Sequence, residues 1–272
     1  MHYRLFVTVL IFFFVNNLFS QSNEKQIVSA GLIDQSISLD GLLDEQEWKS
    51  AGKISSFRMI EPDENSDPSF STVVRIMVDK KNIYLGIICK DPNPDGIVAF
   101  SKARDSKLEN EDYLKFVFDT YGDGRSAYIF SINPFGARYD ALASNRGESE
   151  DSSWDGIWEA KTKLQSDGWT AEIRIPINSL TFRKGLKTWG FNVERRIQRL
   201  IEVDRWSAIS RDYKLAQTIH AGQLNDLPDF NLGIGLMVKG STILDISKSV
   251  ENPGKVKWDN SLDITQIGRA HV

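Results

Sequence analysis

Cysteine and histidine are almost absent from the sequence. Its 272 residues include one cysteine, Cys89, so no disulfide framework can form within the chain. Of the three histidines, His2 lies in an apolar leader and His271 in the last few residues, which leaves His220 for a folded domain. A multi-histidine metal site is therefore excluded, and a histidine-dependent catalytic triad would depend on a single residue.

The sequence also lacks a concentration of positive charge. Its formal net charge is -4, and its 33 lysines and arginines are scattered along the chain. Nucleic-acid binding requires a basic face that neutralises phosphates, so we exclude nucleic acid as a partner. The apolar and charged fractions, 41% and 26%, are those of an ordinary globular protein, so disorder is not expected.

The longest apolar run stands at the N-terminus. Arg4 precedes "LFVTVLIFFFV", and small and polar residues follow it around residues 20–22. The run is too short to cross a bilayer of about 30 Å comfortably, and the pattern is typical of a secretory signal. We expect residues 1–22 to be a signal peptide and the mature protein to be exported, to the periplasm or the cell surface.

The last six residues, "IGRAHV", look like the in-frame translation of a short-read sequencing adapter. We expect residues 267–272 to be an artefact at the end of a truncated reading frame, and we exclude them from reasoning about the fold.

Most segments after the leader alternate apolar and polar residues with a period of two, the pattern of half-buried strands. Three pairs of such segments, each joined by turn-forming residues, predict hairpins over residues 72–90, 113–132 and 157–177. The segment "TWGFNVERRI" predicts a further strand, with "EVDRWSAI" beside it. In the third hairpin, Trp158 and Leu164 are expected on the buried face.

Turn and cap signals complete the fold prediction. Asp167 and Gly168 are expected in the turn of the third hairpin, because this dipeptide tolerates positive φ angles. One short helix is predicted at "LDEQEWKSA", where Asp44 would cap the first turn and Glu47 would reach back to it. About ten short strands and little helix predict an all-β fold, an antiparallel two-sheet β-sandwich of jelly-roll type with one short N-terminal helix.

Seven motifs follow one another along the chain: "ISLDGLLDEQEW", "RIMVDKKNIYLGIICKDPNP", the "RD" of residues 104–105, "DYLKFVFDTYGDGRSAYIFSINPFGARYDA", "WDGIWEA", "DGWTAEIRIPINSLTF" and "WGFNVERRIQRLIE". Together they resemble the N-terminal domain of exported Bacteroidetes proteins, in which a domain similar to the family-nine carbohydrate-binding modules precedes a C-terminal outer-membrane β-barrel. The resemblance covers residues 33–210. It implies that residues 23–225 form the carbohydrate-binding-like sandwich. Residues 226–266, where alternation resumes after a break, would be the start of a truncated barrel region.

The resemblance implies a function as well as a fold. We expect a non-catalytic, outer-membrane-associated module that binds a polysaccharide or oligosaccharide and takes part in carbohydrate catabolism. Its second partner would be its own C-terminal barrel. No enzyme activity is expected, although related modules are often attached to glycoside hydrolases. The alternative is a structural or interaction domain of the barrel that has no sugar ligand.

Candidate ligand-binding residues follow from the chemistry of sugars, whose rings pack on aromatic side chains and whose hydroxyls pair with planar polar groups. In the resembling modules two tryptophans sandwich the sugar, and one of them, with a glutamate, is expected near the strand that begins at Asp112. Lys115 stands at the position of that glutamate, and no tryptophan lies between Trp48 and Trp154. The remaining candidates are loop residues: Trp154, Trp206, Arg104, Asp105 and Arg138.

For several of these residues a structural role is the other interpretation. Trp154 either lines a cleft or caps the end of the core, whereas Trp158 is expected in the core. Arg104 and Asp105, and Arg138 with Asp140, would otherwise form salt bridges that brace loops.

No cofactor is required by the sequence. Asp119 and Asp123 in "DTYGDG" are the candidate ligands of a calcium ion, but the spacing of an EF-hand is absent, and turn chemistry explains the same residues. Haem binding would need an axial methionine, histidine or lysine in a pocket, and the methionines Met59, Met77 and Met237 are scattered.

Overall fold

The computed structural model describes residues 25–230, 236–249 and 252–266. The predicted signal peptide, residues 1–22, and the terminal hexapeptide, residues 267–272, lie outside this part of the chain. Contacts divide the chain into two compact units, Met1–Asp229 and Phe230–Val272.

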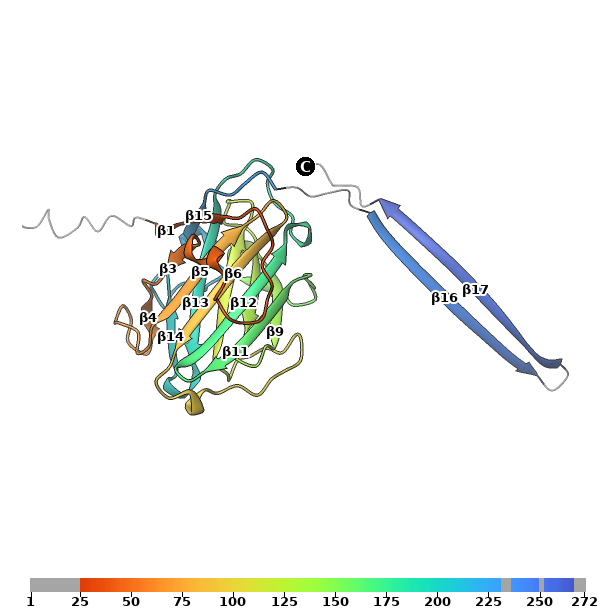
Figure 1. Ribbon diagram of the computed structural model, residues 1–272, viewed down its shortest axis with the longest axis horizontal. Helices are drawn as coiled ribbons and strands as arrows, with labels where there is room; N and C mark the ends of the chain where they lie inside the picture. The colour runs from red at the N-terminus through yellow and green to blue at the C-terminus, as the bar shows by residue number, and fades with distance from the viewer. Residues whose placement is uncertain (1–24, 231–235, 250–251, 267–272) are drawn as a thin grey trace, which may run out of the picture. The chain divides into compact units, whose positions relative to one another are not determined.

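The first unit is a sandwich of two β-sheets (Figure 1). The larger one is here called sheet A. Its main strand order is β1 (Ile27–Ser29), β15 (Gly222–Asn225), β13 (Trp189–Ile197), β7 (Tyr113–Asp119), β8 (Ala127–Ile132), β9 (Arg138–Ser144) and β10 (Ser149–Asp151). In addition, β14 (Glu202–Arg205) pairs with β13, and β4 (Arg58–Glu61) pairs with β14.

The second sheet, sheet B, contains the first and third predicted hairpins. Its strand order is β11 (Glu159–Gln165), β12 (Gly168–Pro176), β6 (Asn82–Lys90), β5 (Thr72–Val78) and β2 (Gly31–Leu32), and β3 (Gly52–Ile54) also pairs with β5. The prediction of a two-sheet β-sandwich is confirmed. The sheets are mixed rather than purely antiparallel, because β1 lies parallel to β15 and β2 parallel to β5. Only Ala30 separates β1 from β2, so one extended segment passes from sheet A to sheet B.

All the helices in the described residues are short 3₁₀ turns. They are η1 (Gln46–Lys49), η2 (Pro94–Gly96), η3 (Asn145–Gly147), η4 (Ile177–Ser179), η5 (Gln198–Leu200) and η6 (Thr218–His220). The predicted N-terminal helix is therefore a single turn, and its capping box is wrong, because the cap residue is Glu45 and no side chain caps the turn. The side chain of Glu47 instead accepts a hydrogen bond from Gln35.

The core lies between the two sheets and is rich in aromatic rings. Phe116 stacks on Phe130 with ring centroids 5.3 Å apart, and Phe118 lies 5.0 Å from Phe191. The inward residues predicted for the first two hairpins and for β12 are buried, whereas on β11 Ala160 and Thr162 are half-buried and Leu164 is exposed. Leu164 is 49% exposed, because β11 is the outermost strand of sheet B and no further strand covers its free side.

Connecting segments cover the outer faces of both sheets. Trp48 and Ile37 from the N-terminal segment pack on Met77 and Tyr84 of sheet B. On sheet A, Leu215 packs with an apolar cluster formed by Val117, Ala127, Ile129, Tyr139, Ala141 and Ala143. The connection from β14 to β15 therefore lies across the outer face of sheet A.

The second unit contains two strands, β16 (Leu236–Ser249) and β17 (Asn252–Gln266), which pair in an antiparallel hairpin. Both fall within the segment where the sequence resumes its alternation. The described part of the chain contains no helix with the length and hydropathy that a transmembrane helix requires.

Candidate functional site

A row of charged side chains crosses the outer face of sheet A. The strand register places Lys115 of β7 opposite Glu194 of β13, Glu194 opposite Arg205 of β14, and Arg205 opposite Arg58 of β4. Side chains of a strand alternate between its two faces. These residues therefore point away from the core, into which Phe116 of the same sheet points. We call these four residues the charged row.

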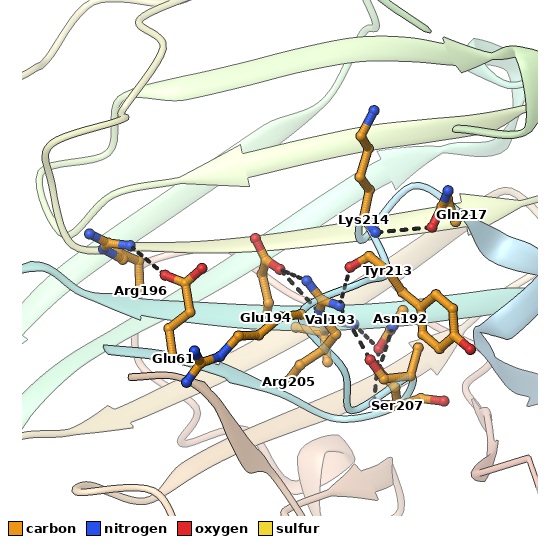
Figure 2. Close-up of polar contacts among 12 residues, drawn as sticks. Glu61, Asn192, Val193, Glu194, Arg196, Arg205, Ser207, Tyr213, Lys214 and Gln217 are labelled. Carbon is orange, nitrogen blue, oxygen red and sulfur yellow. Dashed lines mark hydrogen bonds and ion pairs between the residues drawn. The ribbon is translucent and has the colours of Figure 1, made fainter. Parts of the chain in front are cut away.

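The centre of the charged row is a buried ion pair. Arg205 donates to Glu194 Oε2 from Nη2 at 2.9 Å and from Nε at 3.2 Å (Figure 2). The hydroxyl of Tyr113 donates to Glu194 Oε1 at 3.4 Å. Burial, together with the negative charge of Glu194, raises the pKa of Tyr113 well above its ordinary value of 10. The phenol is therefore neutral throughout the physiological range.

Arg205 also fixes the chain that follows β14. Its Nη1 donates to the carbonyl oxygen of Tyr213 at 2.8 Å and to that of Ala208 at 3.3 Å. Asn192 of β13 exchanges hydrogen bonds with the backbone of Ser207, as Figure 2 also shows. These bonds hold the 206–221 segment against the sheet without any regular secondary structure beyond η6.

The same segment is tied to the turn that follows β4. The guanidinium of Arg211 donates to the carbonyl oxygens of Ile60 and Pro62, and its backbone N–H donates to the carboxylate of Glu64. Two connections that are remote in sequence therefore form one rigid rim.

A groove of about 1070 Å³ lies between these connections. Its walls are residues 55–58, the 64–68 turn and residues 206–209, and it also reaches Thr72 of sheet B and the side chain of Tyr213. Most of the lining side chains carry hydroxyl, amide or charged groups. The volume is slightly above the usual range for ligand sites in proteins, about 300 to 1,000 Å³.

An exposed aromatic pair borders the groove. The rings of Tyr213 and His220 stack with centroids 3.9 Å apart and an angle of 16° between their planes. Both residues line the groove, and Tyr213 is 37% exposed. The stack is therefore an exposed aromatic surface at the groove, of the kind on which the apolar face of a ligand can pack.

Trp206 also lines the groove, but it is buried, not exposed as we expected. Only 3% of its surface is accessible, because its ring packs on Phe191, with centroids 5.9 Å apart, and against the backbone of Gly222. It contributes to the floor of the groove and offers no ring face for stacking.

Arg104 and Arg138 lie elsewhere, near Asp140 on β9, which is three strands from β13 in sheet A. The fully buried carboxylate of Asp140 accepts hydrogen bonds from Trp158 Nε1 at 2.9 Å, Gly156 N at 2.6 Å and Arg104 Nη2 at 2.9 Å. Arg138 lies over the ring of Trp158 at 5.3 Å and donates to its carbonyl oxygen. These contacts brace the 152–158 loop.

Trp154 and Asp105 belong to the same region. The Trp154 ring packs on Tyr128 at 4.8 Å and on Phe130 at 5.9 Å, so it is partly buried. Trp158 is in the core, as predicted. Asp105 pairs with Arg104 at 3.6 Å, and its backbone N–H donates to the carbonyl oxygen of Arg138 at 2.7 Å. The structure thus brings four of the five predicted residues together, apart from Trp206, and ligand contact by any of them stays a prediction.

The predicted calcium ligands have other partners. The Asp119 carboxylate accepts backbone N–H groups of Tyr121, Gly122 and Gly124, and Asp123 accepts the N–H of Arg125. These bonds shape the loop between β7 and β8. Within the described ranges, no three acidic, histidine or cysteine side chains come together as metal ligands would.

The sequence analysis did not predict the groove or most of the charged row. It identified Lys115, and the alternation along β13 could also have placed Glu194 on the outer face. Tyr213 and His220 carried no signal, because the 206–221 segment has no hydrophobic period to orient them.

Comparison with known proteins identifies one family. Residues 39–197, more than half of the chain, match the family described as carbohydrate family 9 binding domain-like. No curated protein matches the chain.

Solved structures share the fold at low sequence identity. A family 9 carbohydrate-binding module from Caldicellulosiruptor kristjanssonii in complex with cellotriose is 15% identical, with a TM-score of 0.52 over 74% of this chain and 93% of that one. A module of the same family and organism in complex with glucose is 15% identical, with a TM-score of 0.51 over 74% and 95%. A protein from Bacteroides uniformis ATCC 8492 described as carbohydrate-binding is 14% identical, with a TM-score of 0.56 over 74% and 99%.

Proposed function

The chain belongs to the carbohydrate family 9 binding domain-like family, and from this premise we propose that it is a non-catalytic module that binds a glycan in the groove beside Tyr213. One observation carries the choice of site. The groove combines a wall of polar side chains with an exposed aromatic stack, and Tyr213 belongs to both.

The chemistry of the groove suits a sugar. A sugar ring has an apolar face, which an aromatic ring shields from water, and hydroxyl groups that need both donors and acceptors. Tyr213 offers the aromatic face, while Ser55, Ser71 and Asn65 offer hydroxyl and amide groups along the walls. The rim is already fixed by Arg205 and Arg211, so binding would order few additional side chains.

The two carboxylates of the groove support binding without catalysis. Asp67 forms an ion pair with Arg58, and Glu64 accepts the backbone N–H of Arg211 at 2.9 Å. A glycosidase needs two carboxyl groups that face the scissile bond, one as acid and one as base or nucleophile. Both groove carboxylates serve instead to hold its rim.

We also propose that the protein acts outside the cytoplasm, associated with the outer membrane through its C-terminal region. The apolar run of residues 5–15 and the alternating sequence of residues 226–266 support this location. Cell fractionation, with N-terminal sequencing of the mature protein, would test it. Recovery of the intact N-terminus in the cytoplasm would contradict it.

The binding proposal is tested by titrating the full chain with glucose, cellotriose and a panel of plant and microbial polysaccharides. Replacing Tyr213 with alanine should weaken binding about tenfold, because the sugar loses its stacking surface. Tyr121→Ala is the matched control, since Tyr121 is similarly exposed but lies on the loop between β7 and β8, away from the groove. Calorimetry gives the affinities.

Two outcomes would overturn the proposal. A folded wild-type protein that binds no glycan would favour the alternative, an interaction domain without a sugar ligand. Equal losses in the Tyr213→Ala and Tyr121→Ala variants would place the binding site outside the groove.

A further inference from the structure

Lys115 has no acidic partner in the described part of the chain. It lies on β7, a central strand of sheet A, and its side chain is only partly exposed. Its ammonium nitrogen lies over the ring of Tyr113, 5.1 Å from the ring centroid. A partly buried ammonium group that lacks a counter-ion attracts anions more strongly than a fully solvated one.

The partners of Glu194 explain why Lys115 lacks an ion pair. Glu194 lies directly opposite Lys115 on β13, but both of its carboxylate oxygens already accept hydrogen bonds from other residues. Oε1 accepts from Tyr113, and Oε2 accepts from two nitrogens of Arg205. The negative charge of Glu194 is thus already balanced by Arg205, and the charge of Lys115 remains in excess.

A second cation lies next to Tyr113, on the neighbouring strand. Arg196 is the partner of Tyr113 on β13 and donates from Nε to Gln198 at 3.0 Å. Figure 2 shows its ion pair with Glu61, which is long at 3.7 Å. The Glu61 side chain is 49% exposed. The Arg196 side chain is only 17% exposed, but an ion pair of this length with a half-exposed carboxylate contributes little, so another anion can replace Glu61.

The charges of this surface do not cancel. Three ion pairs balance three of its cations: Arg58 with Asp67, Arg196 with Glu61, and Arg205 with Glu194. The positive charge of Lys115 is left over. The charged row also leads from Lys115 to Arg58, which lines the groove. Three strand spacings of about 4.8 Å separate the two ends, or roughly 14 Å. A ligand that contacts both ends must therefore be an oligosaccharide, because a single sugar is too short.

We propose that Lys115 and Arg196, both neighbours of Tyr113, form a subsite for the anionic group of an acidic glycan, either the carboxylate of a uronic acid or a sulfate ester. This inference rests on the proposed function, because it assumes that the groove holds the neighbouring sugars of the same chain. Lys115 provides the uncompensated charge, and Arg196, whose Nε is held by Gln198, provides Nη1 and Nη2 to a carboxylate or sulfate that replaces Glu61.

Calorimetry of the full chain tests the subsite. The ligands are cellotriose, an oligouronate and a sulfated oligosaccharide of the same length. At least one of the two acidic ligands should bind about tenfold more tightly than cellotriose at low salt. This advantage should shrink in 0.5 M sodium chloride, where exposed charges are screened. The ligand that gains more identifies the anionic group.

Substitutions then locate the effect. Lys115→Met keeps the aliphatic stem and should remove the advantage of the acidic ligand, while Lys115→Arg should retain most of it. Lys163→Met is the matched control, because Lys163 is an exposed lysine on β11 of the other sheet. Circular dichroism verifies that each variant is folded, and the salt dependence of the wild type tests the same charge without any substitution.

The binding measurements distinguish a failure of the anionic subsite from a failure of the proposed glycan site. Tight binding of cellotriose with no gain for either acidic ligand would overturn the anionic subsite and leave the glycan site intact. A gain that survives both Lys115→Met and high salt would also overturn it. Absence of binding to all three ligands and to the wider glycan panel would overturn both.

Discussion

Asp140 shows how a single buried residue holds a whole loop in place. Its carboxylate receives the indole N–H of Trp158, the backbone N–H of Gly156 and the guanidinium of Arg104. An acidic side chain in the core is stable only when it is fully paired, and here every partner comes from outside β9. The two tryptophans of "WDGIW" thus both have structural contacts, Trp158 with Asp140 and Trp154 with the ring of Tyr128.

Replacing Asp140 with alanine should lower the free energy of unfolding by about 3 kcal/mol, because it leaves a buried indole N–H and a guanidinium without their acceptor. Urea unfolding measures the loss. Asp155→Asn is the control, since Asp155 pairs with the same Arg104 but is largely exposed, and it should cost less than about 1 kcal/mol. Similar losses in the two variants would contradict the central role of Asp140.

At the scale of the element, the hairpin of β11 and β12 shows how close approach of two strands selects a residue. The two-residue turn is Ser166–Asp167, and Gly168, which we expected in the turn, begins β12. Gly168 adopts a φ of +136°, and a Cβ atom there would overlap the carbonyl oxygen of Cys89 on β6. The glycine is therefore required by the neighbouring strand as well as by the turn.

The substitution Gly168→Ala should lower the free energy of unfolding by more than about 2 kcal/mol, because β12 must move away from β6 or the backbone must change its φ angle. Gly185→Ala is the matched comparison. Gly185 also has a positive φ, +79°, but no atom lies within 4 Å of the position of a Cβ, so the cost should be about 1 kcal/mol, for the conformation alone. Urea unfolding of both variants gives the difference, and a larger loss at Gly185 would contradict the argument.

At the scale of the whole molecule, buried carboxyl groups link the fold to pH. Burial raises the pKa of Asp204 to about 8, and the negative charge of Glu202 adds to the effect. Within the described residues, no N–H or hydroxyl group donates to either carboxyl oxygen of Asp204. Burial also raises the pKa of Glu172 to about 7, although its carboxylate accepts N–H groups from Asp40, Gly41 and Trp48.

These shifts predict that stability falls as the pH rises. Between the ordinary carboxyl values, 3.8 and 4.5, and the raised values near 7 and 8, the folded state binds more protons than the unfolded chain. The free energy of unfolding therefore decreases from about pH 5 to pH 9. For each group the decrease is about 1.4 kcal/mol for every pH unit by which its pKa in the folded state exceeds its pKa in the unfolded chain. Thermal unfolding at several pH values measures the decrease.

Asp204→Asn separates this effect from general charge repulsion. Asparagine resembles the protonated carboxyl group, so the variant should lose less stability at high pH than the wild type. Asp167→Asn removes a charge from an exposed ion pair with Lys90 and should leave the pH dependence unchanged. Equal stability of the wild type at pH 5.5 and pH 8.5 would show that the buried carboxyl groups do not titrate as we expect.

The sequence by itself determined the class of the fold. The period of two in the hairpins is a property of neighbouring residues, and it identifies inward side chains such as Phe116 and Ile173 without reference to the rest of the chain. The motif order likewise pointed to the family that residues 39–197 match. Leu164 is exposed although the alternation predicts it to be buried. Its strand lies at the edge of the sheet, and the position of a strand within a sheet cannot be derived from local alternation.

The location of the candidate site was decided only by the tertiary structure. Arg58, Glu194 and Arg205 come from three strands whose adjacency follows from pairing across the sheet. Tyr213 and His220 lie in an irregular segment that is held by hydrogen bonds to Arg205 and to neighbouring connections, and no periodic pattern could orient it. Periodicity fixes the face of a strand on which a side chain lies, whereas a binding groove depends on which distant segments meet.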